Sequence, residues 1–424
     1  MKLNPLVLGM LAGSMIPAAA MAQYSTPQQG TAPGATQSDN RAEPAAPANE
    51  PKVSKGASKA LSDLQKAVNA KDTANIPALI AAAQSKVKTK DDRFVLAQFQ
   101  LKAAVDANDN AAMVAGLQAV VDSGFLSPSE TLPHYMNIGK LSYNAKSYDP
   151  AAAAFEKIVA IDPNNLDAMV MLAESRNGQG RTAEAVSLIE KAIAAKAAAG
   201  QKADESWYKR AVALAFNAKQ PNAPELGRQW VAAYPTAKTW RDAIRIYQTS
   251  GQIDDDALLD TMRLALATGA LAGESDYFRF ANTLVTRGFA GEAKLVLEQG
   301  FAAKSIDRNR ATFSQLYSVA STKAEGDQAS LDASANTALS AATARQGMVT
   351  AEAFYGYGEY AKSAEMFRAA LGKQGVDKDL ANLRAGMALA RAGDKAGAEA
   401  ALKAVGGART EVAKLWLTYL ATKA

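Results

Sequence analysis

Apolar residues recur along the chain at the spacing of amphipathic helices, and Gly, Asn, Asp and Pro interrupt them at regular intervals. Strong helix formers (Ala, Leu, Lys, Glu and Gln) dominate the stretches between these interruptions, and almost no alternating β-pattern occurs. Small residues mark the period, because Ala151, Ala185, Ala223 and Ala257 lie 34, 38 and 34 residues apart, each within a helix-turn-helix pattern. Two helices in about 34 residues predict an all-α fold, an α-solenoid of stacked helical pairs.

The two clearest units span residues 132–165 and 166–199. Large and small residues follow one order in both: Tyr135, Ile138, Gly139, Ala151, Phe155 and Pro163 in the first, and Met169, Leu172, Ala173, Ala185, Ile189 and Ala192 in the second. This order resembles the tetratricopeptide repeat (TPR) family, here of an exported bacterial type. Ser142 departs from the family pattern, which usually has Tyr at that position. The resemblance implies a right-handed superhelix whose concave face is lined by the first helix of each pair.

Close packing explains these residue types. A small residue in each helix of a pair lets the two helices approach, and the large side chains fill the space between them. A proline after the second helix cannot continue it, so the chain turns into the next unit.

The pattern continues, less regularly, on both sides of these units. Residues 199–202 form a short extension before the next pair, and residues 309–345 match the pattern weakly. Further helical pairs are expected near residues 57–88, 92–123, 204–234, 240–266, 274–307, 309–345, 343–370 and from 379 onward, with a C-terminal capping helix at about 409–423.

Residues 1–22 have the pattern of a secretory signal peptide. Lys2 precedes an apolar stretch, and Ala20-Met21-Ala22 is the small-x-small sequence before a cleavage site, which predicts cleavage between Ala22 and Gln23. The alternative is an uncleaved membrane anchor, but the apolar run is short and is broken by Gly and Pro, whereas a span needs about 20 apolar residues.

Residues 23–56 are rich in Pro, Ala and Gln and poor in bulky apolar residues, so we expect a disordered tether before the solenoid of residues 57–424. The chain has no cysteine. It therefore lacks disulfides and the cysteine that would make it a lipoprotein. Together with the signal peptide, this predicts a protein of the periplasm or one that is secreted.

The charge pattern disfavours nucleic acid as a partner. Lys and Arg total 47 and Asp and Glu total 42, and the charges are interspersed without a basic block. No segment after the signal peptide has the apolar length of a membrane span. We therefore expect protein or peptide partners, and the sequence indicates neither their identity nor the oligomeric state.

Three features of the sequence could suggest a metal-binding or catalytic site. His134 is the only histidine, and without cysteines it does not make a common zinc site, so we expect a surface or helix-terminal role. Gly356-Tyr357-Gly358 is expected to be a turn between two helices. Asp254-Asp255-Asp256 precedes a helix and is expected to cap it instead of binding a metal ion. The sequence thus predicts no enzyme, no catalytic or metal-binding residues and no cofactor.

The TPR resemblance also implies which side chains face the groove. In that family, certain positions of the first helix of each repeat point toward the partner, and mixed amide, charged and aromatic side chains there suit an extended peptide or a partner helix. Carried over by register, these positions are Met136, Lys140, Tyr143, Asn144, Val170, Glu174, Asn177, Tyr208, Val212, Phe278, Asn282, Glu352, Tyr355, Met387 and Arg391.

These observations favour a periplasmic scaffold that binds protein or peptide partners through a concave groove, in envelope assembly or maintenance. Two alternatives share the fold. One is a subunit of a polysaccharide or secretion export machine. The other is the solenoid of a cell-wall lytic enzyme, which the sequence disfavours because the repeats run almost to Ala424 and leave no room for a catalytic domain.

Overall fold

The computed structural model describes residues 50–423. The predicted signal peptide, its cleavage site and most of the predicted tether lie outside these residues. Within residues 50–423 the secondary structure consists of α-helices, one short 3-10 helix and one isolated β-bridge between Thr343 and Gln374. The all-α, solenoid-type fold predicted from the period is confirmed.

The helices form two compact units, divided between Gln201 and Lys202. We call residues 50–201 unit 1 and residues 202–423 unit 2. The division falls on the extension at residues 199–202, where the repeat period is interrupted. The sequence predicts one solenoid over residues 57–424, in which this extension interrupts the period.

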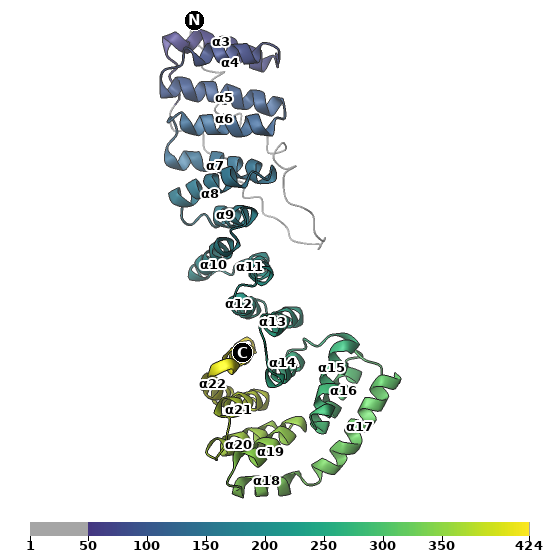
Figure 1. The fold of residues 1–424 in the computed structure, drawn as a ribbon. Helices are drawn as coiled ribbons and strands as arrows, with labels where there is room; N and C mark the ends of the chain where they lie inside the picture. Colours follow the sequence, from purple (N-terminus) through teal and green to yellow (C-terminus); the bar gives the residue numbers. More distant parts are fainter. Residues whose placement is uncertain (1–49, 424) are drawn as a thin grey trace. The chain divides into compact units, whose positions relative to one another are not determined.

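Unit 1 is a stack of antiparallel helices in chain order, in which each helix packs against the next (Figure 1). The pairs expected near residues 57–88 and 92–123 correspond to its first four helices. Its elements are α3 (Lys55–Asn69), α4 (Ile76–Gln84), α5 (Lys90–Asp106), α6 (Asn110–Asp122), α7 (Pro128–Asn144), α8 (Tyr148–Ile161), α9 (Leu166–Gly178) and α10 (Thr182–Ala198).

Helix α7 begins before the predicted repeat start at residue 132, so Pro133 lies inside the helix. The local reason is the sequence at the helix start. Ser127 is the N-cap, Pro128 occupies the first turn, and the Glu130 carboxylate accepts a hydrogen bond from the Ser127 amide at 2.7 Å. This arrangement satisfies an amide at the helix end and fixes the first turn four residues early.

Unit 2 contains more helices in a less regular arrangement (Figure 1). Its elements are α11 (Glu205–Asn217), α12 (Ala223–Ala233), α13 (Ala237–Thr249), α14 (Asp255–Ala267), α15 (Gly273–Thr286), α16 (Ala290–Ala302), α17 (Ala311–Gln328), α18 (Leu331–Ser340), α19 (Ala344–Gly356), α20 (Tyr360–Leu371), α21 (Lys378–Ala392), α22 (Lys395–Lys403), the 3-10 helix η1 (Gly407–Arg409) and α23 (Thr410–Thr422).

Helices α17 and α18 depart from the hairpin expected at residues 309–345. Helix α17 packs against α15 and α16, whereas α18 packs against α19 and α20. Helix α16 contacts α19 directly. The two backbones are so close at Gly356 that a Cβ there would lie 2.9 Å from the Glu292 amide nitrogen. The glycine therefore allows α16 and α19 to join, with α17 and α18 outside the α16–α19 contact.

Helix α23 matches the expected capping helix, but it does more than cover the last pair. It contacts α21 and α22 and also α12 and α14, so the C-terminal end of the chain returns to the beginning of unit 2 (Figure 1). Trp416 is fully buried there, and the ring of Tyr419 lies 6.5 Å from that of Trp240 on α13. Unit 2 is thus closed by contacts between helices far apart in sequence.

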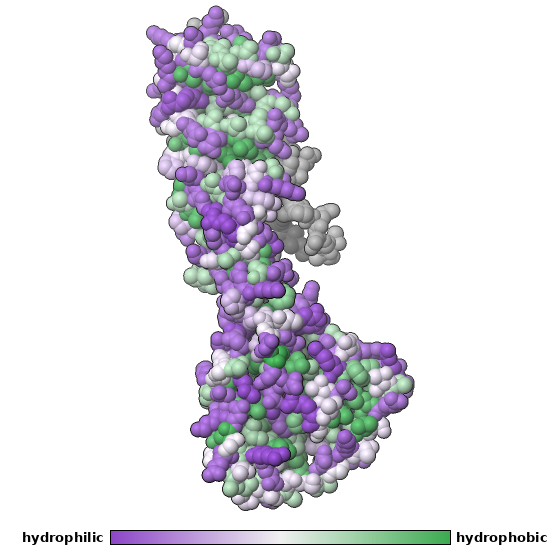
Figure 2. Space-filling view, in the orientation of Figure 1, coloured by the Kyte–Doolittle hydropathy of each residue, from purple (hydrophilic) through white to green (hydrophobic). Residues whose placement is uncertain are grey.

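The middle of helix α21 is buried within this closed arrangement. Every residue from 383 to 390 is buried, so the helix has no polar outer face over two turns. A helix that is buried all round is enclosed by other elements. The space-filling view shows polar and apolar residues intermixed over the visible face of each unit (Figure 2). The main apolar cluster of unit 2 consists of buried residues.

Candidate functional site

Helices α7 and α9 of unit 1 carry the candidate partner-binding face, because they are the first helices of the two clearest repeats. Close packing behind them fixes their position. A Cβ on Gly139 would lie 2.5 Å from the ring of Phe155, which is fully buried, and Ala151 is also fully buried. The predicted small and large positions are therefore the ones that join α7 to α8.

The next contact joins α8 to α9. A Cβ on Gly178 would lie 2.5 Å from the ring of Tyr148, so the ring lies directly on the helix backbone. The Gln179 side chain donates to the Asp149 carboxylate at 2.6 Å, and Arg176 forms an ion pair with Glu156. These contacts hold α9 beside α7, which it touches directly.

The seven side chains predicted for the groove of unit 1 are exposed or half-buried. Lys140 and Asn144 are exposed, and the other five are half-buried: Met136, Tyr143, Val170, Glu174 and Asn177. The predicted set thus lies on two neighbouring helices and remains accessible in part at every position.

Two of these side chains are held in place by neighbours. The Tyr143 ring meets the Tyr148 ring edge to face, with 5.7 Å between their centres. The Asn177 amide oxygen accepts a hydrogen bond from the Thr182 hydroxyl at 3.1 Å. Because the oxygen is engaged, the amide nitrogen of Asn177 is the group that can donate to a carbonyl of a partner.

The predicted groove positions of unit 2 differ. Their side chains are packed within the unit at five positions: Tyr208, Val212, Glu352, Tyr355 and Met387 are all buried. For α19 and α21 the physical reason is the closed arrangement, which places α14, α16 and α23 close to these helices. These five residues are not accessible to a partner in this structure, so the expected open groove does not extend through unit 2.

The remaining three positions of unit 2 are not brought together as a surface. Phe278 and Asn282 on α15 are exposed. Arg391 on α21 is half-buried and donates to the Tyr360 hydroxyl at 3.0 Å.

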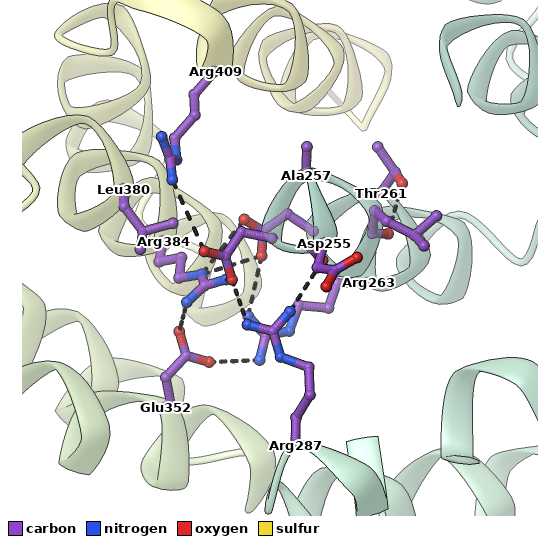
Figure 3. A network of polar contacts seen from close by, with 12 residues as sticks. Asp255, Ala257, Thr261, Arg263, Arg287, Glu352, Leu380, Arg384 and Arg409 are labelled. Atoms are coloured by element: carbon purple, nitrogen blue, oxygen red, sulfur yellow. Dashed lines mark hydrogen bonds and ion pairs between the residues drawn. The ribbon is translucent and has the colours of Figure 1, made fainter. Parts of the chain in front are cut away.

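Glu352 belongs to a network of buried charges that the sequence analysis did not identify (Figure 3). Arg263 on α14 is its centre. The guanidinium makes a bidentate pair with Glu292 on α16, at 2.8 and 2.6 Å, and also donates to Glu352 on α19 at 2.6 Å. Its third contact is with Asp260, one turn earlier on α14, at 3.2 Å.

Arg384 on α21 makes the second set of contacts (Figure 3). It lies 2.7 Å from a Glu352 oxygen and 3.2 Å from an Asp260 oxygen, and it donates to Asp256 at 2.8 Å. Arg287, which follows α15, reaches Asp256 from the outer side. The network therefore connects α14, α16, α19 and α21 with the end of α15.

Burial and charge act in opposite directions on these carboxyl groups. Burial acts to raise the pKa of Glu352, but Arg263 and Arg384 outweigh it and hold this pKa below its usual value. Burial also acts to raise the pKa of Asp256, but Arg384 and Arg287 outweigh it, so this pKa is lowered too. In Asp260 and Glu292 burial dominates and raises the pKa. No signal in the sequence joins these residues, since up to 128 positions separate the partners.

The three sequence features that could suggest a metal-binding or catalytic site lie at a helix cap, in a turn and inside a helix. Asp254 caps α14, because its carboxylate accepts from the Ala257 amide at 2.7 Å, which confirms the predicted cap. Gly358 follows α19 with φ of +79°, which confirms the predicted turn. His134 lies within α7 and is half-buried, and burial lowers its pKa, so the helix-end alternative is wrong.

Residues 50–423 contain no group of three or more His, Cys, Asp or Glu side chains placed to hold a metal ion. None of the helices described there has the length and apolar character to cross a membrane.

Comparisons with known proteins agree with the repeat pattern. Residues 143–203, which include α8, α9 and α10, match the family model described as tetratricopeptide repeat. No curated protein matches the chain. A solved structure described as "Structure of Naa15/Naa10 bound to HypK-THB" is similar at 14% sequence identity with a TM-score of 0.29, over 84% of this chain and 58% of that one. The present chain thus spans less than two thirds of that protein, and so distant a likeness carries no functional argument. The tetratricopeptide match thus covers residues 143–203, which is less than half of the chain.

Proposed function

We propose that the protein is an exported scaffold that binds a segment of a protein partner across α7 and α9 of unit 1, in envelope assembly or maintenance. One observation carries this proposal. All seven predicted groove side chains of unit 1 are at least partly exposed on two adjacent helices, whereas five of eight in unit 2 are buried. Export is supported by the signal-peptide pattern of residues 1–22.

The chemistry of this face suits a polypeptide segment. Asn144 and Asn177 offer amide groups that pair with a peptide backbone, Met136 and Val170 offer apolar contact, and the Tyr143 ring is held by Tyr148. A ring fixed in advance loses little conformational entropy on binding, and tyrosine is common among residues that dominate binding energies.

The proposal is tested by replacing Tyr143 and Asn144 together with alanine. Partners are crosslinked in intact cells, captured with the full chain and quantified by mass spectrometry, with Lys157→Ala on the exposed part of α8 as the matched control. We expect at least a tenfold loss of specific partners with the double variant and no loss with the control. Equal recovery from both variants, with unchanged helical content, would exclude this face.

A further inference from the structure

The inner part of the charge network in unit 2 contains unequal numbers of positive and negative groups. Three carboxyl groups (Asp260, Glu292 and Glu352) meet two guanidinium groups (Arg263 and Arg384), and none of these side chains is more than 5% exposed. Fully ionised, the five groups would carry one uncompensated negative charge. An unpaired buried charge is costly, and a buried carboxyl group usually avoids that cost by taking up a proton.

The contacts show which carboxyl group is best placed to carry the proton. Glu292 has a bidentate pair with Arg263, and Glu352 accepts a hydrogen bond from Arg263 at 2.6 Å through Oε2. Its Oε1 lies 2.7 Å from Arg384 in an ion pair that lacks hydrogen-bond geometry. A guanidinium group this close to each carboxyl oxygen favours the ionised form of both groups. Asp260 has longer contacts: Oδ1 lies 3.2 Å from both Arg263 and Arg384, and Oδ2 lies 3.4 Å from Arg384.

A protonated Asp260 keeps these contacts. Its carbonyl oxygen, Oδ1, still accepts from both arginines, and Oδ2 carries the hydrogen. The same change at Glu352 would disturb one of two short contacts to guanidinium groups. The network therefore loses least when the proton is on Asp260.

The surroundings of Asp260 supply no further positive charge to its carboxyl group. Asp256 on the same helix lies at the rim, where Arg287 and Arg409 face its carboxylate in addition to Arg384. Arg409, at the end of η1, also pairs with Asp377 at 3.3 Å. The Trp416 indole on α23 donates to the Asp260 backbone carbonyl at 3.4 Å. The other titratable or charged side chains that face this region are Tyr247 on α13, Tyr355 on α19, and Glu411 on α23, which pairs with Arg228 on α12.

We infer that folded unit 2 holds one proton on the Asp260 carboxyl group at neutral pH, and that it loses this proton on unfolding. Protonation leaves two carboxylates and two guanidinium groups in the inner network, so the buried charges balance. Unit 2 is then a pH-responsive element, independent of the binding face proposed on unit 1.

The electrostatic environment agrees with this assignment. Burial raises the pKa of Asp260 and outweighs the two arginines. Burial raises the pKa of Glu292 as well, but the bidentate pair with Arg263 keeps that group the more strongly stabilised as a carboxylate. The pKa of Glu352 is lowered, as expected for the group with two short guanidinium contacts.

The sign of the pH effect follows from linkage. A carboxyl group whose pKa is higher in the folded than in the unfolded protein binds a proton on folding, so its contribution to stability falls as pH rises between the two pKa values. One such proton changes the unfolding equilibrium constant about tenfold per pH unit. Acid therefore stabilises unit 2 through Asp260, in contrast to the usual behaviour of a paired carboxylate.

The chain is well suited to the measurement. All four tryptophans (Trp207, Trp230, Trp240 and Trp416) lie in unit 2, so tryptophan fluorescence of the full chain reports on this unit. The only histidine is in unit 1 and there is no cysteine, so unit 2 lacks the side chains that ordinarily titrate between about pH 5 and pH 8.

The test is urea unfolding of the full chain, followed by tryptophan fluorescence from about pH 5 to pH 7, for the natural protein, Asp260→Asn and the control Glu352→Gln. For the natural chain we expect the unfolding equilibrium constant to rise about tenfold per pH unit. Asp260→Asn, which resembles the protonated acid, should abolish this dependence on pH. Its urea midpoint at pH 7 should equal that of the natural chain. Glu352→Gln should lower the midpoint at pH 7.

Three results would overturn the inference. They are a flat profile for the natural chain, an unchanged slope in Asp260→Asn, and a loss of stability at pH 7 in Asp260→Asn as large as that in Glu352→Gln.

Discussion

The ring of Phe155 occupies the space that a side chain at Gly139 would need. A Cβ at position 139 would lie 2.5 Å from the Cε1 and Cζ atoms of this fully buried ring. Helices α7 and α8 therefore approach each other through a contact that only glycine permits.

We accordingly expect Gly139→Ala to destabilise unit 1. Forcing a methyl group into a close-packed contact costs about 1–3 kcal/mol. The measurement is thermal unfolding followed by far-ultraviolet circular dichroism, with the tryptophan fluorescence of unit 2 recorded in parallel.

The matched control for this variant is Gly56→Ala. Gly56 is exposed in α3 and a Cβ there would meet nothing within 4 Å. Alanine should leave stability unchanged or raise it by up to about 1 kcal/mol, because alanine is the better helix former. Equal destabilisation by both variants would contradict the packing argument.

Much of this arrangement could be predicted from the sequence, because it depends on local patterns. Gly139, Ala151 and Phe155 lie within one repeat, and their sizes and spacing determine the contact between α7 and α8. The caps and turns at Asp254 and Gly358 follow from neighbouring residues in the same way.

The closed arrangement of unit 2 could not be predicted in this way. Its contacts join residues far apart in sequence, such as Arg263 with Glu352 and Arg228 with Glu411. A charge at a groove position is equally compatible with a solvated groove and with a buried pair. For Glu352, the approach of Arg263 on α14 and Arg384 on α21 separates these cases. Glu352 thus lies on the helix that the repeat register predicts, but the partners of its carboxylate come from helices that the register does not bring together.

Asp92 is expected to anchor the beginning of unit 1. Its carboxylate accepts from the amide and hydroxyl of Ser54 at 2.8 and 2.9 Å and from the amides of Lys88 and Thr89 at 3.2 Å. Asp92→Ala leaves these donors without their acceptor and should cost about 1–3 kcal/mol. Circular dichroism during urea unfolding checks this, and Asp63→Ala, which removes only an exposed ion pair at 3.7 Å, should change stability by less than about 1 kcal/mol.

The same carboxylate gives unit 1 an acid sensitivity. Burial acts to raise the pKa of Asp92, but the hydrogen bonds from Ser54, Lys88 and Thr89 outweigh it and hold the pKa below its usual value. A lowered pKa contributes stability that is present above the unfolded value of about 3.9 and is lost as pH falls through the folded value. Between about pH 5 and pH 2 the natural chain should therefore lose more stability in unit 1 than Asp92→Asn does. Identical acid profiles would exclude this role.

Gly356→Ala should weaken unit 2 by about 1–3 kcal/mol, because the added methyl group would lie 2.9 Å from the Glu292 backbone and push α16 away from α19. Tryptophan fluorescence during urea unfolding measures the effect. Gly326→Ala is the matched control, since position 326 is also helical but a Cβ there would meet nothing within 4 Å. An equal midpoint for the two variants would show that this contact tolerates a side chain.

The turn between α7 and α8 contains a strained residue. Lys146 has φ of +59°, a left-handed conformation that costs a residue with a side chain about 1–2 kcal/mol, whereas the corresponding turn after α9 has Gly180 at +78°. Lys146→Gly should therefore stabilise unit 1 by about 0.5–1 kcal/mol after the larger entropy loss of glycine is subtracted. Calorimetry of the full chain checks the sign, and a lower melting temperature for the variant would contradict it.

The central claim is that partners bind across α7 and α9 of unit 1. The most direct test places a photo-crosslinking amino acid at one exposed position at a time: Lys140 and Asn144 on the proposed face, and Lys157 on α8 as the control. The account predicts that irradiation of intact cells joins the same envelope protein to positions 140 and 144 and that position 157 does not capture it. Capture of that protein from position 157 alone, or equally from all three positions, would contradict the account.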